Sequence, residues 1–155
     1  MSLAAFEQQI KLVTDRIADK PLDSELEEFL NLEFPADGDL FQQINQTCHQ
    51  AIEEGWMCQN EHGGIRFGRV IKPSDALSRY SVDVVHMQNI AGPHHRHPNG
   101  EIDMIMPISD SARFDGRGKG WLVYPPDSAH PPTVTGGDAL VLYLLPEGAI
   151  EFTRR

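Results

Sequence analysis

Three of the seven histidines in this 155-residue chain, together with two acids, fall within the stretch GPHHRHPNGEIDM, from Gly92 to Met104. In a β-strand, side chains two residues apart point to the same face. His95 and His97 should therefore project together, and Glu101, which follows a PNG turn, can return beside them on the next strand. Imidazoles and a carboxylate grouped in this way are typical ligands of a divalent metal ion.

A fourth ligand has to come from elsewhere in the chain, and His130 is the natural candidate. It stands in YPPDSAHPP, isolated among prolines and small residues after another strand and turn. Iron, manganese, zinc, nickel and cobalt all suit such a site, and affinity does not choose among them because geometry and metal supply decide. Taken singly, each histidine is better explained as a turn or surface residue. The spacing of the whole group favours metal binding.

Two further polar residues lie next to these ligands. Asp103 falls on the same face as Glu101, and it could move a proton, as could Glu101 if that residue is not a ligand. A plain structural role for Asp103 in an edge strand or turn is equally consistent with the sequence. His94 either holds a ligand or substrate atom or is simply exposed. No ligand role is assigned to the remaining histidines, which are His49, His62 and His86.

The elements that must position these residues fall into two parts with different periodicities. In the first third of the chain, apolar residues recur at steps of three and four, which is typical of helices. We expect helices from Leu3 to Ile17, within DSELEEFLNLEF, and from Asp39 to Glu54. From Trp56 the period is two, which predicts short strands separated by Pro- and Gly-rich turns. These strands are GIRFGRV, YSVDVVHMQNI, EIDMIMPI, GWLVY, ALVLYLL and AIEFTR.

Many short strands at near-regular spacing are typical of an antiparallel barrel or a double-sheet jelly roll. The sequence contains no internal repeat and no low-complexity linker. The predicted fold class is therefore mainly β, an antiparallel β-barrel or jelly roll with an N-terminal α-helical segment. We expect a single domain over 1–155, in which the helical segment 1–55 packs on the barrel 56–155.

The net charge of −10 arises in the first part of the chain, which has 13 acidic and three basic residues up to Glu61; the rest has ten of each. An acidic surface of this kind disfavours nucleic acid and anionic membranes as partners. The longest apolar runs are too short to span a bilayer, and the first ten residues do not resemble a secretory signal. Cys48 and Cys58 are expected to be reduced thiols in a cytoplasmic protein.

The pattern H-x-H-x3-E, followed some thirty residues later by a lone histidine, resembles the two motifs of cupins. The first motif is HRHPNGE and the second is PPDSAH. Pro107 and Asp127 stand where cupins usually have glycines, and Val134 stands where an asparagine is usual, which loosens the details of the turns but not the predicted fold. In cupins the matching residues bind metal. The resemblance therefore implies a divalent metal held by His95, His97, Glu101 and His130.

A closer resemblance covers nearly the whole chain. HHRHPNGEIDMIMP, ARFDG, GWLVYPPDSAHPPTVTGG and ALVLYLLPEGAIEFTR, behind an acidic helical front, are together similar to the 4-hydroxylaminobenzoate lyase family of bacterial nitroaromatic degradation. This family was formerly a domain of unknown function. The resemblance implies conversion of 4-hydroxylaminobenzoate to 3,4-dihydroxybenzoate with release of ammonia.

Such a substrate is a small aromatic acid, and its carboxylate calls for an arginine. Arg113 is favoured because it lies between the two motifs. Tyr124 precedes the His130 turn, so its hydroxyl can reach the site. The candidate catalytic residues are Glu101, Asp103 and Tyr124. The candidate substrate-binding residues are Arg113, Arg66, Arg96 and His94, although each arginine is more often a surface residue.

Three other functions stay open on the sequence. A cupin dioxygenase or isomerase acting on a related aromatic would share the ligands. A sensor barrel usually carries a DNA-binding helical domain, and the acidic front lacks a basic recognition face. A metal-free scaffold is the fourth possibility. Because barrels of this kind often pair through edge strands, we expect a homodimer or a higher homo-oligomer.

Overall fold

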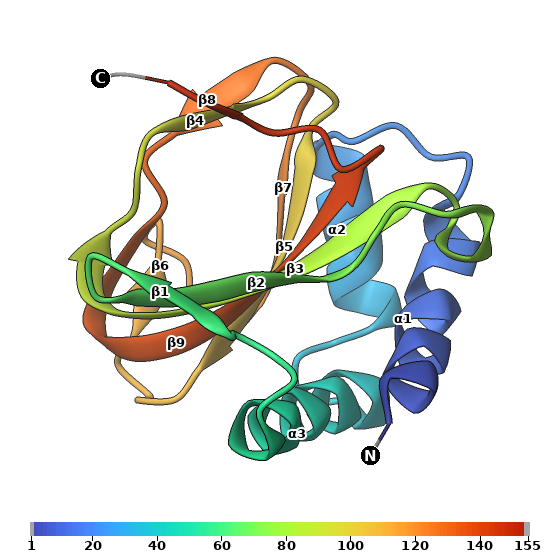
Figure 1. Ribbon diagram of the computed structural model, residues 1–155. Helices are drawn as coiled ribbons and strands as arrows, with labels where there is room; N and C mark the ends of the chain where they lie inside the picture. Colours follow the sequence, from blue (N-terminus) through green and yellow to red (C-terminus); the bar gives the residue numbers. More distant parts are fainter. Residues whose placement is uncertain (1, 154–155) are drawn as a thin grey trace.

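The structure, a computed structural model, describes residues 2–153. Figure 1 shows a small sheet, a larger curved sheet and, beneath the larger sheet, the helices. The helices are α1 (Leu3–Ile17), α2 (Ser24–Glu33) and α3 (Asp39–Glu54), with a short 3-10 turn at Asp75–Leu77. The strands are β1 (Asn60–His62), β2 (Ile65–Ile71), β3 (Tyr80–Ala91), β4 (His95–His97), β5 (Glu101–Pro107), β6 (Arg113–Phe114), β7 (Gly120–Tyr124), β8 (Ser128–His130), β9 (Thr133–Pro146) and β10 (Glu151–Phe152).

The helix ends follow from capping residues in the sequence. The carboxylate of Asp23 accepts a hydrogen bond from the backbone N–H of Leu26 at the start of α2. Gly55 ends α3 in the left-handed conformation, at φ +90°, which a glycine adopts without steric cost. The three helices therefore lie where the sequence predicts them.

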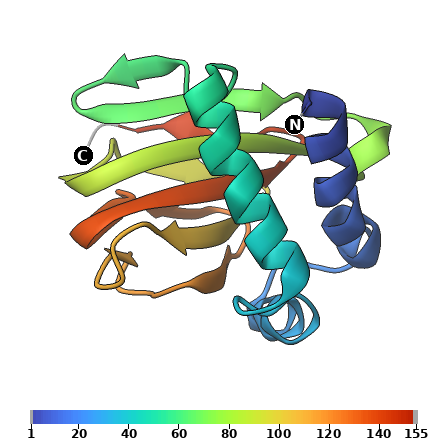
Figure 2. The same ribbon diagram turned by 90° about the horizontal axis from the view of Figure 1, so that it is seen from below.

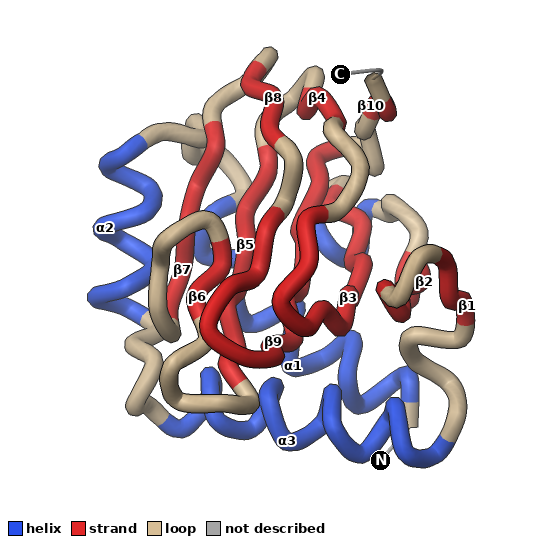
Figure 3. Tube along the Cα trace, turned by 90° about the vertical axis from the view of Figure 1, so that its left-hand side faces the viewer, coloured by secondary structure: helices blue, strands red, loops and turns tan. Residues whose placement is uncertain are grey.

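The strands form two antiparallel sheets. The larger sheet has the order β1-β2-β3-β9-β5-β7, with β6 paired to β9, and the smaller sheet has the order β10-β4-β8. Figure 3 shows β4, β8 and β10 at one end of the molecule and α3 at the other. The predicted mainly β jelly-roll class with an N-terminal helical segment is confirmed, although among the described residues the sheets do not close into a barrel.

The larger sheet separates two apolar cores because side chains alternate along each strand. On β9, Leu140, Leu142 and Leu144 pack toward the helices, whereas Val141 and Tyr143 pack into the space between the sheets. Figure 2 shows α3 crossing the strands on the helical side. The space between the sheets is thus enclosed by strands on both sides, and it is this space that receives the polar residues of β5.

Helix α2 protects the edge strand β7. The side-chain amide of Asn31 donates to the carbonyl of Trp121 and accepts from its backbone N–H, each at 3.0 Å. The carboxylate of Glu27 accepts from the backbone N–H of Val123 at 2.9 Å. Without α2, the backbone N–H and C=O groups at this edge of β7 would be free to pair with a strand of another chain. The helix therefore satisfies the outer hydrogen bonds of a strand that has no neighbouring strand on that side.

Four short strands, β1, β4, β6 and β8, were not separately predicted, although the same-face argument for His95 and His97 assumes β4. The last predicted strand extends to Arg154, which lies outside the described residues. Cys48 and Cys58 are both buried and form no disulfide. Within residues 2–153, no helix has the length and apolar character needed to cross a membrane.

Replacing Asn31 with Ala should destabilise the protein, because it removes two hydrogen bonds from the edge of β7. We expect a loss of about 1 kcal/mol in the free energy of unfolding. This corresponds to a fall of roughly 2–4 °C in Tm, measured by circular dichroism. Gln46→Ala, on an exposed position of α3, is the control and should melt like the wild type. Equal melting of Asn31→Ala and Gln46→Ala would contradict the edge-protection role.

Candidate functional site

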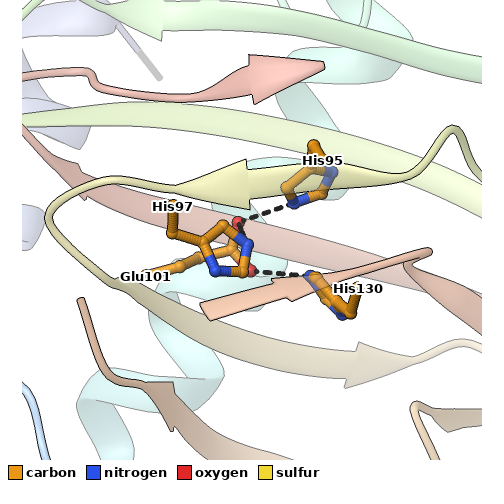
Figure 4. Close-up of side chains that lie close together, drawn as sticks. All are labelled: His95, His97, Glu101 and His130. Carbon is orange, nitrogen blue, oxygen red and sulfur yellow. Dashed lines mark ion pairs between the residues drawn. The ribbon is translucent and has the colours of Figure 1, made fainter. Parts of the chain in front are cut away.

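Two sheets contribute the four predicted ligands to one point. β4 and β8 pair so that His95 lies directly opposite His130, and His97 lies opposite Ser128. Glu101 is the first residue of β5, in the other sheet. Figure 4 shows the carboxylate of Glu101 among the three imidazole rings. The structure thus brings His95, His97, Glu101 and His130 together across the space between the sheets.

The turn between β4 and β5 requires a glycine. Gly100 has φ +89°, and a Cβ atom there would lie 2.8 Å from the carbonyl oxygen of Tyr124 and 2.7 Å from Leu22. Contacts this short exclude any side chain at position 100 without movement of the backbone. The PNG sequence therefore lets the chain reverse within three residues and carry Glu101 back beside the histidines.

The distances from Glu101 to the three histidines are compatible with a shared metal ion. One ligand atom from each of the four residues lies within 4.8 Å of the others. The Nε2 atoms of His95, His97 and His130 lie 3.4, 3.2 and 3.4 Å from the Glu101 oxygens. Ligands about 2.1 Å from one metal, at tetrahedral or octahedral angles, are separated by roughly 3.0–3.4 Å.

The same atoms are buried and unpaired. Seven of the nine buried side-chain N and O atoms without a hydrogen-bond partner among residues 2–153 belong to this cluster and to Asp103. His97 and Glu101 are completely buried, and His95 is 2 % exposed. Burying polar atoms without partners is costly, and a metal ion would satisfy the ligand atoms at once. The cluster is therefore compatible with a metal site.

Neighbouring residues accept hydrogen bonds from Nδ1 of His97 and His130, which leaves Nε2 of each ring facing the cluster. The hydroxyl of Ser128 donates to the carbonyl of Pro125 at 2.6 Å, so it accepts the Nδ1–H of His97 at 2.9 Å. The carboxylate of Asp115 likewise accepts the Nδ1–H of His130 at 2.5 Å. When either ring is neutral, the proton is therefore on Nδ1 and the lone pair is on Nε2, which faces the cluster; this is the usual arrangement around metal-binding histidines.

Asp115 is held in place by two further hydrogen bonds. Its carboxylate accepts from the hydroxyl of Tyr124 at 2.6 Å and from the backbone N–H of Thr133 at 2.9 Å. Asp115 and Gly116 both have positive φ and form the two-residue turn of a hairpin closed by Phe114 and Arg117. The Asp-Gly pair in ARFDG signals this turn in the sequence. The contact with His130 depends on the tertiary fold and carries no such signal.

The pKa values of the two buried acids of β5 are shifted in opposite directions. Burial raises the pKa of Glu101, but the contacts with His130, His95 and His97 outweigh burial and hold the pKa well below its usual range. Burial and the nearby charge of Glu101 raise the pKa of Asp103 well above its usual range. The surroundings therefore favour the charged form of Glu101, which suits ligation, and they favour the neutral form of Asp103 more than water does.

A cavity of about 370 Å³ reaches the cluster at His95. Its walls are mostly apolar and include Val85, Tyr143 and Phe152, and it lies between the two sheets. A cavity of this size and character suits a small ligand with an aromatic ring. The cavity also contacts Arg69 and Asp83, which the sequence does not single out.

The other predicted site residues lie at different distances from the cluster. The ring centroid of Tyr124 lies 4.5 Å from that of His130, with the ring planes tilted by 46°, and the Tyr124 hydroxyl donates to Asp115. His94 Nδ1 contacts the hydroxyl of Thr153. The guanidinium of Arg96 pairs with Asp127 and Glu151 on the opposite face of β4. Arg113 and Arg66 are exposed and do not line the cavity.

Comparison with known proteins identifies related sequences and folds. A family model described as 4-hydroxylaminobenzoate lyase matches residues 8–152. Proteins named 4-hydroxylaminobenzoate lyase from Nocardioides sp. (strain LMS-CY) and Pseudomonas putida are 29 % and 27 % identical to this chain. The first match covers 83 % of this chain and 81 % of the relative, and the second covers 88 % of each.

Solved structures of cupin-like proteins are more distant. A protein of unknown function with a cupin-like fold from Ralstonia eutropha JMP134 is 18 % identical, with a TM-score of 0.43 over 64 % of this chain and 65 % of that chain. The DMSP lyase DddQ from Ruegeria pomeroyi DSS-3 is 21 % identical, with a TM-score of 0.42. That match covers 57 % of this chain and about half, 51 %, of the solved chain.

Replacing Asp115 with Asn should weaken metal binding. The side-chain amide of this variant can still accept a hydrogen bond from the backbone N–H of Thr133. It carries no negative charge, so it binds the Nδ1–H of His130 less strongly than the carboxylate does. We expect the metal affinity to fall about 10- to 100-fold, measured by competition with a chelator. Asp110→Asn, on an exposed position just before the same hairpin, is the matched control. An unchanged affinity in folded Asp115→Asn protein would show that Asp115 does not position His130.

Proposed function

Because this chain belongs to the 4-hydroxylaminobenzoate lyase family, we propose that it converts 4-hydroxylaminobenzoate to 3,4-dihydroxybenzoate and ammonia. The observation that supports this reaction most directly is a cluster of three imidazoles and a carboxylate that adjoins an apolar cavity at His95. The cavity suits the ring, and the cluster suits the polar chemistry at the nitrogen.

The proposed reaction consumes one water molecule and needs no external oxidant. The N–O bond breaks, carbon 3 of the ring exchanges its hydrogen for a hydroxyl group, and a second hydroxyl group replaces the nitrogen on carbon 4, so that the nitrogen leaves as ammonia. The two hydroxyl oxygens balance the oxygen of the hydroxylamino group and that of one water molecule. The nitrogen is thereby reduced and the ring is oxidised by the same amount. His95, His97, Glu101 and His130 would hold a divalent metal, which would supply a Lewis acid and lower the pKa of a bound water.

The chain's own residues have distinct parts in this proposal. Glu101 is held as an anion by the histidines and contributes negative charge to the ligand set. Asp103 is fully buried on the same face, and its pKa is raised well above the usual range, so its neutral form is the candidate proton donor as the N–O bond breaks. Asp115 and Ser128 keep His130 and His97 in the ligating tautomer.

Purified, metal-loaded protein should release ammonia and 3,4-dihydroxybenzoate in equal amounts from 4-hydroxylaminobenzoate. Ammonia is measured enzymatically and the catechol by chromatography. The yield should be the same under nitrogen and in air, with no oxygen consumed at an electrode, because the reaction is internally redox-balanced.

The control is His97→Ala, which should lose bound metal by elemental analysis and turnover together, whereas His49→Ala on the exposed side of α3 should keep both. Product that forms only with oxygen would assign the protein to the oxygenases instead. Full activity of metal-free His97→Ala would rule out a role for the cluster.

A further inference from the structure

One permanent positive charge lies in the wall of the apolar cavity. Of the described residues that line it, Arg69 is the only lysine or arginine. Its side chain is 35 % exposed, and it projects from β2, as does Phe67 of the same cavity wall. A guanidinium beside an apolar cavity is a natural binding group for a carboxylate.

The guanidinium of Arg69 is fixed in orientation by three hydrogen bonds. Its Nε and Nη2 donate to the two oxygens of Asp83 at 2.8 and 3.2 Å, and Nη2 also donates to the carbonyl of Gly148 at 3.1 Å. Its Nη1 has no hydrogen-bond partner within residues 2–153. A preoriented guanidinium with free N–H groups loses little conformational entropy when it binds an anion.

The strand register connects Arg69 to the cluster. Arg69 pairs with Asp83, Asp83 pairs with Tyr143, and Tyr143 pairs with Asp103. Directly paired residues of antiparallel strands share a face. The four side chains therefore form one row across the inner face of the larger sheet, with Tyr143 and the cavity between the guanidinium and the cluster.

We propose that Arg69, oriented by Asp83, binds the carboxylate of an aromatic acid whose ring lies in the cavity and whose opposite end faces the cluster. The acid group of the ligand is taken from the proposed function, on which this assignment rests. Arg69 is thus a specificity-determining residue that selects acids over neutral aromatics. It differs from the three arginines that the sequence suggests, because it alone contacts the cavity.

The test measures binding of a non-reactive pair of ligands by isothermal titration calorimetry on metal-loaded protein. 4-Aminobenzoate has the carboxylate but no N–O bond, and 4-aminobenzamide is its neutral counterpart. The wild type should bind the acid more tightly than the amide. Arg69→Gln should lose at least about tenfold in affinity for the acid and change by less than about threefold for the amide.

Two further variants separate the guanidinium from other effects. Arg69→Gln combined with Asp83→Asn leaves the net charge of the pair unchanged and should still lose the preference for the acid. Arg79→Gln breaks a similar arginine–carboxylate fork, with Glu147, outside the cavity and should bind both ligands like the wild type. If Arg69→Gln does not fold, Arg69→Lys replaces it, with a several-fold loss expected for the acid alone.

The outcomes distinguish this assignment from the proposed function. Equal affinity of the wild type for acid and amide, or equal losses for both in Arg69→Gln, would overturn the assignment even if the lyase reaction is observed. An acid preference that depends on Arg69 supports the assignment even if 4-hydroxylaminobenzoate is not turned over, in which case only the proposed reaction fails.

Discussion

The central constraint in this structure is a carboxylate buried between two sheets without a hydrogen bond. Glu101 is fully buried, and both of its oxygens face imidazole nitrogens that also lack hydrogen-bond partners in the described part of the chain. A buried carboxylate requires positive charge beside it, and here either protonated imidazoles or a metal ion bound by the same nitrogens would supply that charge. The separation of the four ligand atoms, their burial and the tautomers imposed by Ser128 and Asp115 all favour a metal ion in that place.

The rest of the fold serves to bring these ligands together. The pairing of β4 with β8 places His95 opposite His130, and the glycine turn between β4 and β5 brings Glu101 of the larger sheet beside them. The helices cover the other face of the larger sheet, so that its inner face can hold polar residues. The row from Arg69 to Asp103 uses that inner face, with the cavity above it. Arg69, the apolar cavity and the histidine–glutamate cluster thus lie in sequence along the inner face of the larger sheet.

The sequence predicts the helices, the class of fold and the grouping of His95, His97, Glu101 and His130, because each depends on local periodicity, turn chemistry or a recognisable spacing. Asp127 shows that a turn can keep its backbone conformation when its residue changes. It stands where cupins usually have a glycine, and it still adopts the positive φ of +66° that glycine favours. The roles of Asp115 and Arg69 could not be predicted in this way. Asp115 reaches His130 only through the hairpin that the fold places there. Arg69 lies beside the cavity because β2 pairs with β3 and β3 pairs with β9, which follows much later in the chain. Such contacts depend on tertiary structure and not on residue type.

Family membership and the site geometry support the same chemistry from independent directions. The relatives are named 4-hydroxylaminobenzoate lyases, and the cavity adjoins a group of residues compatible with a metal site. The most direct measurement of the central claim is X-ray absorption spectroscopy of the protein loaded with one equivalent of cobalt. The account predicts a first shell of nitrogen and oxygen with the multiple-scattering signal of three imidazoles. A shell containing sulfur, or the signal of fewer than two imidazoles, would contradict it.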